Sequence, residues 1–579
     1  MPEQPPKATV PGARPDGPAR PRPETPATGP DFSEVMDTGR LAVAERAAWS
    51  LVWLGVLTAG VSVSYFWWSS EFIAALAPLM VLFALAGLLG TWVSTPRRRW
   101  LQAAALVGLE AAIALPQAIA IHTRIFYSTD SAAFDQLSAR ALLNGHNPYT
   151  VSLQSAARLF SVPARYWTYT VGGGHVTSTS YPAGSFLLQV PALALGIHHR
   201  SVDWTDLVCW MACAALFFFL LPRSLRWLAG LLAIMSFFVS SVSNGNTDAM
   251  FLPLLLVAVW RWDRYGDPTE RGPARWIGPL ALGLACAVKQ TPWFCVPFLT
   301  LGVAIEARHA GRSALRGAAR YLATVLAVFA AVNLPFAAWG PHAWAHGVLL
   351  PLIGGLVADG QGLVTLATHG VTGGVELGML SMAGAFALAG ALVAFALWYP
   401  VLKRAWLLLL PFAFLFSPRS LSTYLLDLMP VAIMAAVSVH GTVTRRHRVA
   451  VRAVAIFAVL VVGVIASSAL AFSSQTLRIA VDAAQLEGGN QSVTVTVTNL
   501  TDAVQRPHFM VNPGEGTAGY WAAGDRAPVV LAPHGRAMLR LHPPATVAAP
   551  QRGARWLVEA YTTSPAALST SRLLPWPFR

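Results

Sequence analysis

Long apolar runs, separated by short polar or basic segments, are the feature that most constrains how this chain can fold. A helix needs about 20 mostly apolar residues to cross the hydrocarbon core of a bilayer, and several runs reach that length. Only 12% of the residues are charged, whereas a soluble domain has about a quarter. The sequence therefore predicts a polytopic α-helical membrane protein whose first partner is the lipid bilayer.

Basic segments between the apolar runs predict the orientation. Lys and Arg accumulate in cytoplasmic loops, so the segments Pro96–Arg99, Arg261–Arg275, Arg308–Arg320, Lys403–Arg404 and Arg445–Arg448 should be cytoplasmic. All five face the cytoplasm if the chain crosses thirteen times with its N-terminus inside. The thirteen spans are expected near residues 47–68, 73–95, 101–121, 204–221, 224–243, 248–262, 276–289, 291–306, 318–338, 376–399, 405–417, 420–440 and 450–472.

One further apolar segment, residues 183–197, does not fit this count. A crossing there would invert every later loop, so we expect an interfacial or re-entrant helix. The alternative is that this segment spans and a neighbour, such as residues 224–243, does not.

The two ends of the chain differ from the membrane domain, which we place at residues 45–472. Residues 1–44 are rich in Pro, Ala, Gly and Thr and predict a disordered cytoplasmic tail. Residues 473–579 predict an extracytoplasmic β-sandwich, because Gln491–Asn499 alternates β-branched and polar residues and Pro/Gly breaks follow regularly. Such a domain could bind sugar or only cap the membrane domain, and the sequence favours the cap.

Charge and cysteine content exclude two other classes of function. The net charge of +14 comes largely from Arg in short loops, which indicates membrane orientation rather than nucleic-acid binding. The four cysteines lie inside apolar runs, and no Asp, Glu or His group has the spacing of metal ligands. We therefore expect no disulfide framework, no metal and no cofactor.

Polar clusters between the expected spans all fall on the outer side of this topology. Polar residues near membrane depth are costly and tend to mark function, so five clusters on one face predict an active site there. The clusters are the outer loops 122–182 and 339–375 and the shorter segments Asn244–Asp248, Lys289–Pro292 and Ser417–Ser420.

The first outer loop carries the most specific motif. It is an Asp, an aromatic residue four positions on, and then Leu-Leu-x-Gly-x-Asn-Pro-Tyr, formed by Asp130, Phe134, Leu142, Leu143, Gly145, Asn147, Pro148 and Tyr149. Tyr181-Pro182, Gly245-Asn246, Lys289 with Pro292, and Gly360–Leu363 follow in order. This set resembles the GT-C superfamily of membrane glycosyltransferases, specifically glycosyltransferase family 87. Gly362 departs from the pattern, which has Ser there.

The resemblance, which covers about residues 100–440, implies a GT-C-like fold and a polyprenyl-phosphate-sugar-dependent glycosyltransferase. Such enzymes of actinobacteria move mannose or arabinofuranose from the donor lipid to a hydroxyl of a cell-envelope glycolipid or glycan on the outer face. The acceptor alcohol needs a base, and we choose Asp130, which follows a membrane helix. Asp135 is second, or else an exposed helix charge. Asp248 is third, or else a helix cap.

Cations are needed where the leaving phosphate gains negative charge. Lys289 either contacts that phosphate or pairs with a buried carboxylate, and Arg419 either binds phosphate or snorkels to the interface. Further candidates for substrate contacts are Tyr149, Tyr181, Asn246 and Gln361. The second outer loop adds His342, His346 and His369, which rank lower because a lone loop His is usually only solvated.

Two carboxylates, Glu110 and Asp427, lie inside expected spans and have no assigned role, although an intramembrane carboxylate is a functional candidate. The main alternative to a transferase is a transporter or flippase for lipid-linked sugars. It would predict internal repeats and ionisable groups at mid-membrane, whereas the polar clusters here gather at one face.

Overall fold

The fold is described from a computed structural model of the whole chain, with side chains. The predicted tail up to residue 37, the predicted basic segment Arg445–Arg448 and the motif residue Asn246 lie outside the described residues. The description covers residues 38–66, 71–234, 245, 247–265, 274–353, 355–439, 451–487, 490–512, 519–524, 528–544 and 555–575.

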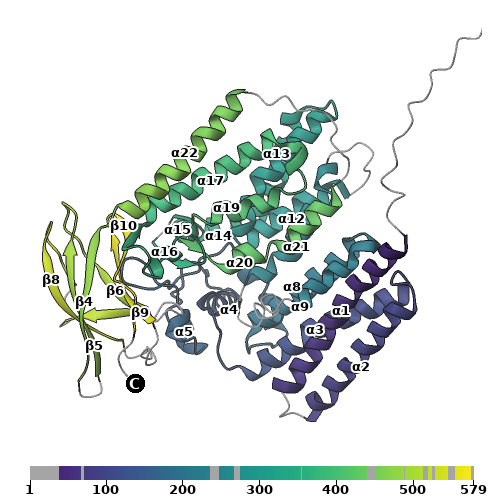
Figure 1. Ribbon diagram of the computed structural model, residues 1–579, viewed down its shortest axis with the longest axis horizontal. Helices are drawn as coiled ribbons and strands as arrows, with labels where there is room; N and C mark the ends of the chain where they lie inside the picture. The colour runs from purple at the N-terminus through teal and green to yellow at the C-terminus, as the bar shows by residue number, and fades with distance from the viewer. Residues whose placement is uncertain are drawn as a thin grey trace, which may run out of the picture.

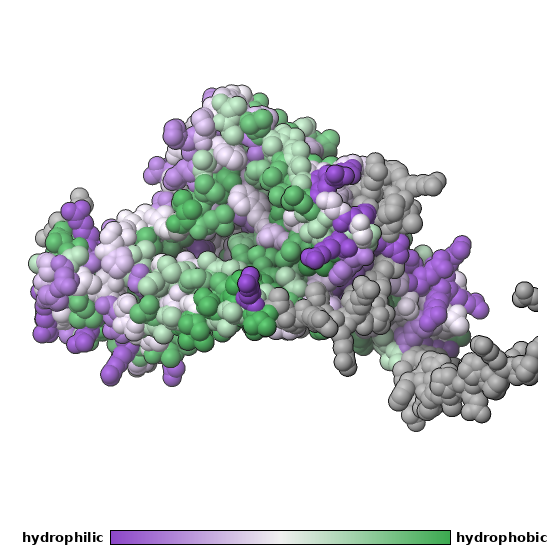
Figure 2. Space-filling model, turned by 90° about the horizontal axis from the view of Figure 1, so that it is seen from above, coloured by the Kyte–Doolittle hydropathy of each residue, from purple (hydrophilic) through white to green (hydrophobic). Residues whose placement is uncertain are grey.

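Seven helices in this part of the chain are long and apolar enough to cross a bilayer (Figure 1). Much of the surface of the helical part is hydrophobic (Figure 2), and α22 shows why. Its exposed side chains include Val459, Val462 and Ile465, which suit lipid and not water. The chain is therefore a multi-pass membrane protein. The seven helices are α1 (Thr38–Phe66), α2 (Glu71–Val93), α3 (Arg99–Thr123), α8 (Ser201–Leu220), α14 (Ala314–Trp339), α17 (Leu377–Leu397) and α22 (Val451–Ser473).

The structure differs from the expected thirteen full-length spans, because the other six segments, in the residues described, are shorter or broken. The segment 405–417, for example, is a 3-10 turn followed by a helix of five residues, and 224–243 is described only in part. Hydropathy cannot distinguish a lipid-facing span from an apolar helix buried among other helices, such as α11, whose Leu252, Leu255 and Leu256 are fully enclosed. Others of the shorter helices, such as α12 with Ile277, Leu280 and Leu284, also have exposed apolar side chains. The shorter helices are α9 (Leu231–Ile234), α11 (Leu252–Val259), α12 (Ala274–Val288), α13 (Cys295–His309), α18 (Tyr399–Leu402), α19 (Leu410–Phe414), α20 (Ser422–Leu426) and α21 (Met429–Ser438).

The outer loops are built from short helices. Residues 183–197 form two of these, α6 (Gly184–Leu187) and α7 (Val190–Ala194), and neither is long enough to cross, in line with an interfacial segment. The other helices of the outer loops are α4 (Asp130–Leu143), α5 (Ala156–Leu159), α15 (Pro341–Ile353) and α16 (Thr365–Thr368).

The C-terminal region is one antiparallel sheet of nine strands that curls around a single core, rather than the expected sandwich of two sheets. The predicted strand 491–499 is confirmed as β5, with Val493, Val495 and Val497 buried. These side chains pack with Trp556 and Val558 of β9 from the other half of the sheet. The strands are β2 (Gly374–Glu376), β4 (Leu477–Glu487), β5 (Asn490–Asn499), β6 (His508–Asn512), β7 (Tyr520–Ala523), β8 (Arg536–His542), β9 (Arg555–Thr563), β10 (Ala566–Thr570) and β11 (Leu574–Pro575).

The membrane domain contributes one strand to this sheet. The strand β2 lies just before α17, and it pairs with β10 so that Val375 lies opposite Leu568. At the other end of the strand order, α22 leads directly into β4 (Figure 1). Two connections therefore hold the β domain against one end of the helical part. One is the covalent link from α22 to β4, and the other is the set of hydrogen bonds between β2 and β10.

Three of the segments expected to be cytoplasmic contain or adjoin residues that meet in one cluster of charges. The Lys403 ammonium lies 3.2 Å from Asp263 Oδ2 and 2.7 Å from Glu306 Oε1. The Tyr399 hydroxyl donates to the same Glu306 oxygen at 2.6 Å. The cluster joins Asp263 of the segment 261–275, the end of α13 and the Lys403–Arg404 turn, in line with the expectation that these segments lie on one side of a membrane.

We predict that Lys403→Ala destabilises the protein by about 3 kcal/mol or more, because it removes the cation shared by two mostly buried carboxylates. The midpoint of thermal unfolding in detergent measures this. Arg404→Ala is the matched control, since it removes the same charge from the next, exposed residue and should change stability by less than about 0.5 kcal/mol. Equal effects of the two substitutions would contradict the role of the cluster.

Candidate active site

A cavity of about 360 Å³ lies where the predicted outer clusters meet. Its lining comes from four segments that are far apart in the sequence. These are residues 128–134 with 165–181 of the first outer loop, the turn 289–294, residues 350–359 of the second outer loop, and residues 414–424. The cavity thus combines both long loops with two of the short polar turns, and we call it the central cavity.

Asp130 stands in the wall of the central cavity, in the first turn of α4. The preceding Thr129 caps this helix by accepting from the Ala132 N–H, and its hydroxyl donates to the Gly245 carbonyl at 2.7 Å. The Asp130 carboxylate accepts hydrogen bonds from the Thr168 N–H at 2.5 Å and the Thr168 hydroxyl at 3.1 Å. Burial raises the pKa of Asp130, while Thr168 and the charge of Arg419 oppose that rise.

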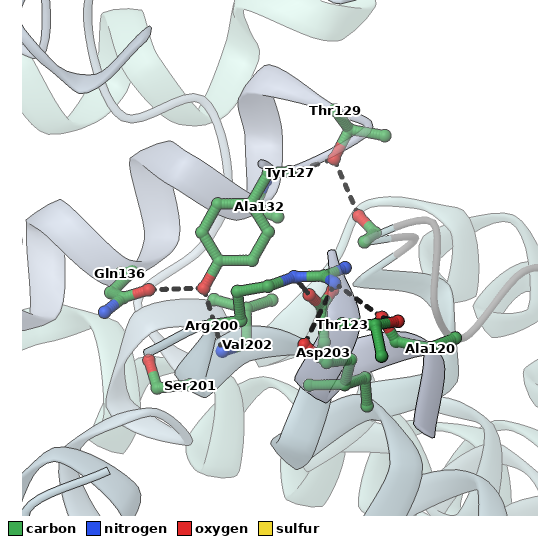
Figure 3. Close-up of polar contacts among 12 residues, drawn as sticks. Ala120, Thr123, Tyr127, Thr129, Ala132, Gln136, Arg200, Ser201, Val202 and Asp203 are labelled. Carbon is green, nitrogen blue, oxygen red and sulfur yellow. Dashed lines mark hydrogen bonds and ion pairs between the residues drawn. The ribbon is translucent and has the colours of Figure 1, made fainter. Parts of the chain in front are cut away.

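A polar network behind α4 ties this helix to the ends of α3 and α8 (Figure 3). The Arg200 guanidinium forms an ion pair with Asp203 at 2.5 Å and donates to the Ala120 carbonyl at the end of α3. Tyr127 connects α4 and α8, because its hydroxyl donates to Gln136 and accepts from the Val202 N–H. The bonds of Tyr127 and Thr129 therefore fix the first half of α4, which carries Asp130.

Asp135 lies below the cavity and is fully buried, so it is not an exposed helix charge. The Ser185 hydroxyl donates to its Oδ1 at 2.8 Å, and its Oδ2 has no hydrogen-bond partner in the described residues. Burial raises the pKa of Asp135 to about 7, against the opposing effects of Ser185 and Lys289. The two candidate bases thus differ in access, since only Asp130 lines the cavity.

Lys289 reaches the cavity from the turn after α12 and also pairs with Asp248. Its ammonium lies 2.6 Å from Asp248 Oδ1, and both side chains are more than nine-tenths buried. It also lies over the rings of Tyr181 at 5.2 Å and Tyr424 at 5.9 Å. Both roles expected for Lys289 are therefore open to it: it pairs with a buried carboxylate and it faces the cavity.

Arg419 lines the cavity from a short strand, β3 (Arg419–Ser420), which runs parallel to β1 (Asp359–Gly360). Its guanidinium is 3.6 Å from the Asp359 carboxylate, a long ion pair whose acidic partner is 42% exposed. Such a pair is weak in high dielectric, so the Arg419 charge is less neutralised than that of Lys289. With Arg165, three cationic side chains line the cavity beside two acidic ones.

Several predicted contact residues lie away from the cavity. Tyr149 is buried against Phe186, and its hydroxyl donates to the Tyr181 carbonyl at 2.7 Å. His342 and His346 are exposed on α15. The structure thus brings together Asp130, Lys289, Arg419, Tyr181 and, through its ion pair, Asp248, but not these three.

Gln361 is also exposed, as is His369, and neither lines the cavity. The Gln361 N–H donates to the Ser420 carbonyl at 2.7 Å, which holds the second loop against β3. The next residue explains the departure from the family pattern. A Cβ at Gly362 would come within 2.6 Å of the Leu415 carbonyl oxygen, so a Ser would not fit without a shift of the backbone.

Sequence reasoning missed Thr168, Arg165 and Asp359, all of which line the cavity. None stands in a recognisable motif, and each acquires its place only when the loops fold together. In the described residues no group of three or more His, Cys, Asp or Glu side chains could hold a metal ion. No family model, no curated protein and no solved structure matches the chain.

We predict that Lys289→Met costs about 3–5 kcal/mol of stability, because it leaves the buried Asp248 carboxylate without its cation. The double variant Lys289→Met with Asp248→Asn removes both charges and should recover most of that loss. Thermal unfolding of the two single variants and the double variant measures the coupling. A double variant whose loss equals the sum of the two single losses would show that the pair is not coupled.

Proposed function

We propose that the protein is a membrane glycosyltransferase that moves a sugar from a polyprenyl-phosphate donor to a hydroxyl of a cell-envelope acceptor. The observation that carries the proposal is one cavity lined by a buried carboxylate, Asp130, and by the cations Lys289, Arg419 and Arg165. The resemblance of the first outer loop to family 87 transferases supports the same reaction. Mannose and arabinofuranose donors both fit this chemistry, with the reaction on the outer face of the membrane.

The reaction requires a proton acceptor at the acceptor hydroxyl. Its oxygen attacks the anomeric carbon, the bond from that carbon to the phosphate oxygen breaks, and the proton passes to a base. Asp130 suits this role because it lines the cavity and its hydrogen bonds from Thr168 favour the ionised form. Asp135 has no access to the cavity and is the second candidate.

The leaving polyprenyl phosphate changes from a diester with one negative charge to a monoester that gains a second. Cations aimed at that oxygen stabilise the transition state more than the ground state. Arg419 is the first candidate, since its partner Asp359 is distant and its planar guanidinium can bind two phosphate oxygens. Lys289 supplies a second charge that Asp248 partly neutralises.

An apolar groove supports a donor with a lipid tail. It has a volume of about 710 Å³ and lies between α13 and α14, with Trp293, Leu301, Leu322 and Phe329 in its walls. The turn 289–294 separates it from the central cavity, because Trp293 lines the groove while Phe294 lines the cavity. A polyprenyl chain in the groove would therefore place its phosphate near Lys289.

A transporter for lipid-linked sugars is the second candidate, on account of two buried carboxylates in candidate spans. Asp206 of α8 is fully buried, and neither it nor Glu110 of α3 has a hydrogen-bond partner for its carboxylate in the described residues. Asp427 is also buried. Ionisable groups at such positions often bind protons or ions in transporters.

We expect the purified protein to release polyprenyl phosphate when it is given a polyprenyl-phospho-sugar and an acceptor glycan. Asp130→Asn should lower kcat by at least about a hundredfold, because it removes the base but keeps the size of the side chain. Asp135→Asn is the matched control and should lose less than about tenfold.

Activity of the wild-type enzyme should also fall as the pH falls through the raised pKa of Asp130, since the base works only when ionised. An inactive Asp135→Asn beside an active Asp130→Asn would move the base to Asp135. Movement of the donor lipid across vesicles without release of phosphate would replace the transferase by the transporter.

We predict that Ala304→Trp, which fills the apolar groove, raises KM for a long-chain donor about tenfold or more, because several methylenes lose their burial. A donor with a tail too short to enter the groove should keep its KM. Val462→Trp, at an exposed apolar position of α22, is the control and should change neither value. An equal rise of KM for the long and short donors would exclude the groove as the tail site.

A further inference from the structure

The hydrogen bonds to Asp130 come from a small hairpin in the first outer loop, which we call the 168–176 hairpin. Its arms are joined where the Val176 N–H donates to the Thr168 carbonyl at 2.8 Å and the Thr170 N–H donates to the Gly174 carbonyl at 2.9 Å. Three glycines, 172–174, form its tip. A two-stranded hairpin with such a tip is marginal alone, so it needs neighbours to fix its position.

The second outer loop holds one side of the 168–176 hairpin. The Val171 N–H donates to the Gly355 carbonyl at 2.8 Å, and the Val357 N–H donates to the Tyr169 carbonyl at 3.0 Å. These bonds extend the hairpin by one more short stretch of strand-like pairing. They leave the tip uncovered on its other side. The Thr170 carbonyl accepts the Gly173 N–H at 3.1 Å within the hairpin, and its second lone pair can accept a contact from another direction.

The β domain provides that contact through β6 and β7. The Tyr520 hydroxyl donates to the Thr170 carbonyl at 2.5 Å, and the Tyr520 ring packs edge-on against Tyr169 at 5.6 Å. The His508 imidazole lies so close to Gly173 that a Cβ there would collide with it, and Gly173 has a φ of +90°. The tip of the hairpin thus contacts the β domain directly, and only glycine fits at position 173.

The β domain itself has no side chain in the wall of the central cavity, whose described lining ends at Tyr424. Its influence on the cavity therefore passes through the elements it touches. The 168–176 hairpin is one of these, and Thr170 is two residues from Thr168.

We propose that the C-terminal β domain is a positioning domain, in which Tyr520 fixes the 168–176 hairpin so that Thr168 can hold the Asp130 carboxylate. The role of Asp130 as base rests on the proposed function, whereas the contact between Tyr520 and the hairpin does not. Tyr520 is a positioning residue, because it reaches the reacting atoms only through Thr170 and Thr168.

Loosening the hairpin should move the pH profile of activity in one direction. The Thr168 bonds favour the ionised carboxylate, so their weakening raises the pKa of Asp130 and moves the acid limb of kcat/KM to higher pH. The other groups that act on Asp130 are Arg419 and Tyr169, and the charged groups Arg165, Lys289 and Asp359 share its cavity. Tyr520→Phe leaves all five of these side chains unchanged.

The test is Tyr520→Phe in the full-length protein, which removes the hydroxyl and keeps the ring. We expect faster amide exchange in residues 168–176, a loss of about three- to tenfold in kcat/KM at neutral pH, and recovery of that loss at higher pH. Tyr561→Phe is the matched control. It removes a hydroxyl that donates to Glu559 inside the β domain at 3.0 Å, and it should leave both readouts at the wild-type values.

Thr168→Val provides a second test, because it removes the hydroxyl that donates to Asp130. If Tyr520 acts through Thr168, the double variant Thr168→Val with Tyr520→Phe should move the acid limb of kcat/KM by less than the sum of the two single variants. Wild-type exchange and a wild-type pH profile in Tyr520→Phe would overturn the proposal, and so would an equal change in Tyr561→Phe. A wild-type protein without transferase activity would overturn the proposed function instead, and the exchange measurement would still decide the role of Tyr520.

Discussion

A charge removed from water must be paired or lose its ionisation, and this constraint organises the helical part of the molecule. Lys289 with Asp248 connects the turn after α12 to the start of α11. At the other end of α13 Lys403 joins two acidic residues, and α13 is 15 residues or about 20 Å long. Each ion pair joins segments that are distant in the sequence. Separating the segments that each ion pair joins would therefore leave a buried charge without this partner, which is costly in free energy.

Asp130 differs from Asp248 in its partners, and it is the buried carboxylate that lines the central cavity. Its direct partners are the N–H and hydroxyl of Thr168, which donate hydrogen bonds and carry no charge. These two bonds use part of the carboxylate's four lone-pair sites, so a lone pair remains to accept a proton, as a base requires. Asp248 has Lys289 at 2.6 Å and is far less suited to accept a proton. Of these two carboxylates, Asp248 is thus neutralised by Lys289, whereas Asp130 faces the cavity and can accept a proton.

The sequence predicted the outline of this arrangement, because hydropathy and polar clusters are local signals. It predicted the membrane class, the seven long helices among its thirteen spans, and the strand now called β5. It could not show that helices such as α11 are enclosed by others, nor that the β strands form one curled sheet with β2 added from the membrane domain. Thr168 and Asp359 carried no signal, since their roles depend on where two loops meet.

The sidedness of the site can be argued without counting spans. The count of thirteen gave the expected orientation, and the structure contains fewer full-length helices than that count. The central cavity and the β domain nevertheless belong to the same side, because Tyr520 contacts the loop that carries Thr168 and β2 pairs with β10. The helix α22 follows the basic segment Arg445–Arg448 in the sequence and leads into β4, so these two lie at opposite ends of one span. The preference of basic segments for the cytoplasm then supports the proposal that the cavity faces outward.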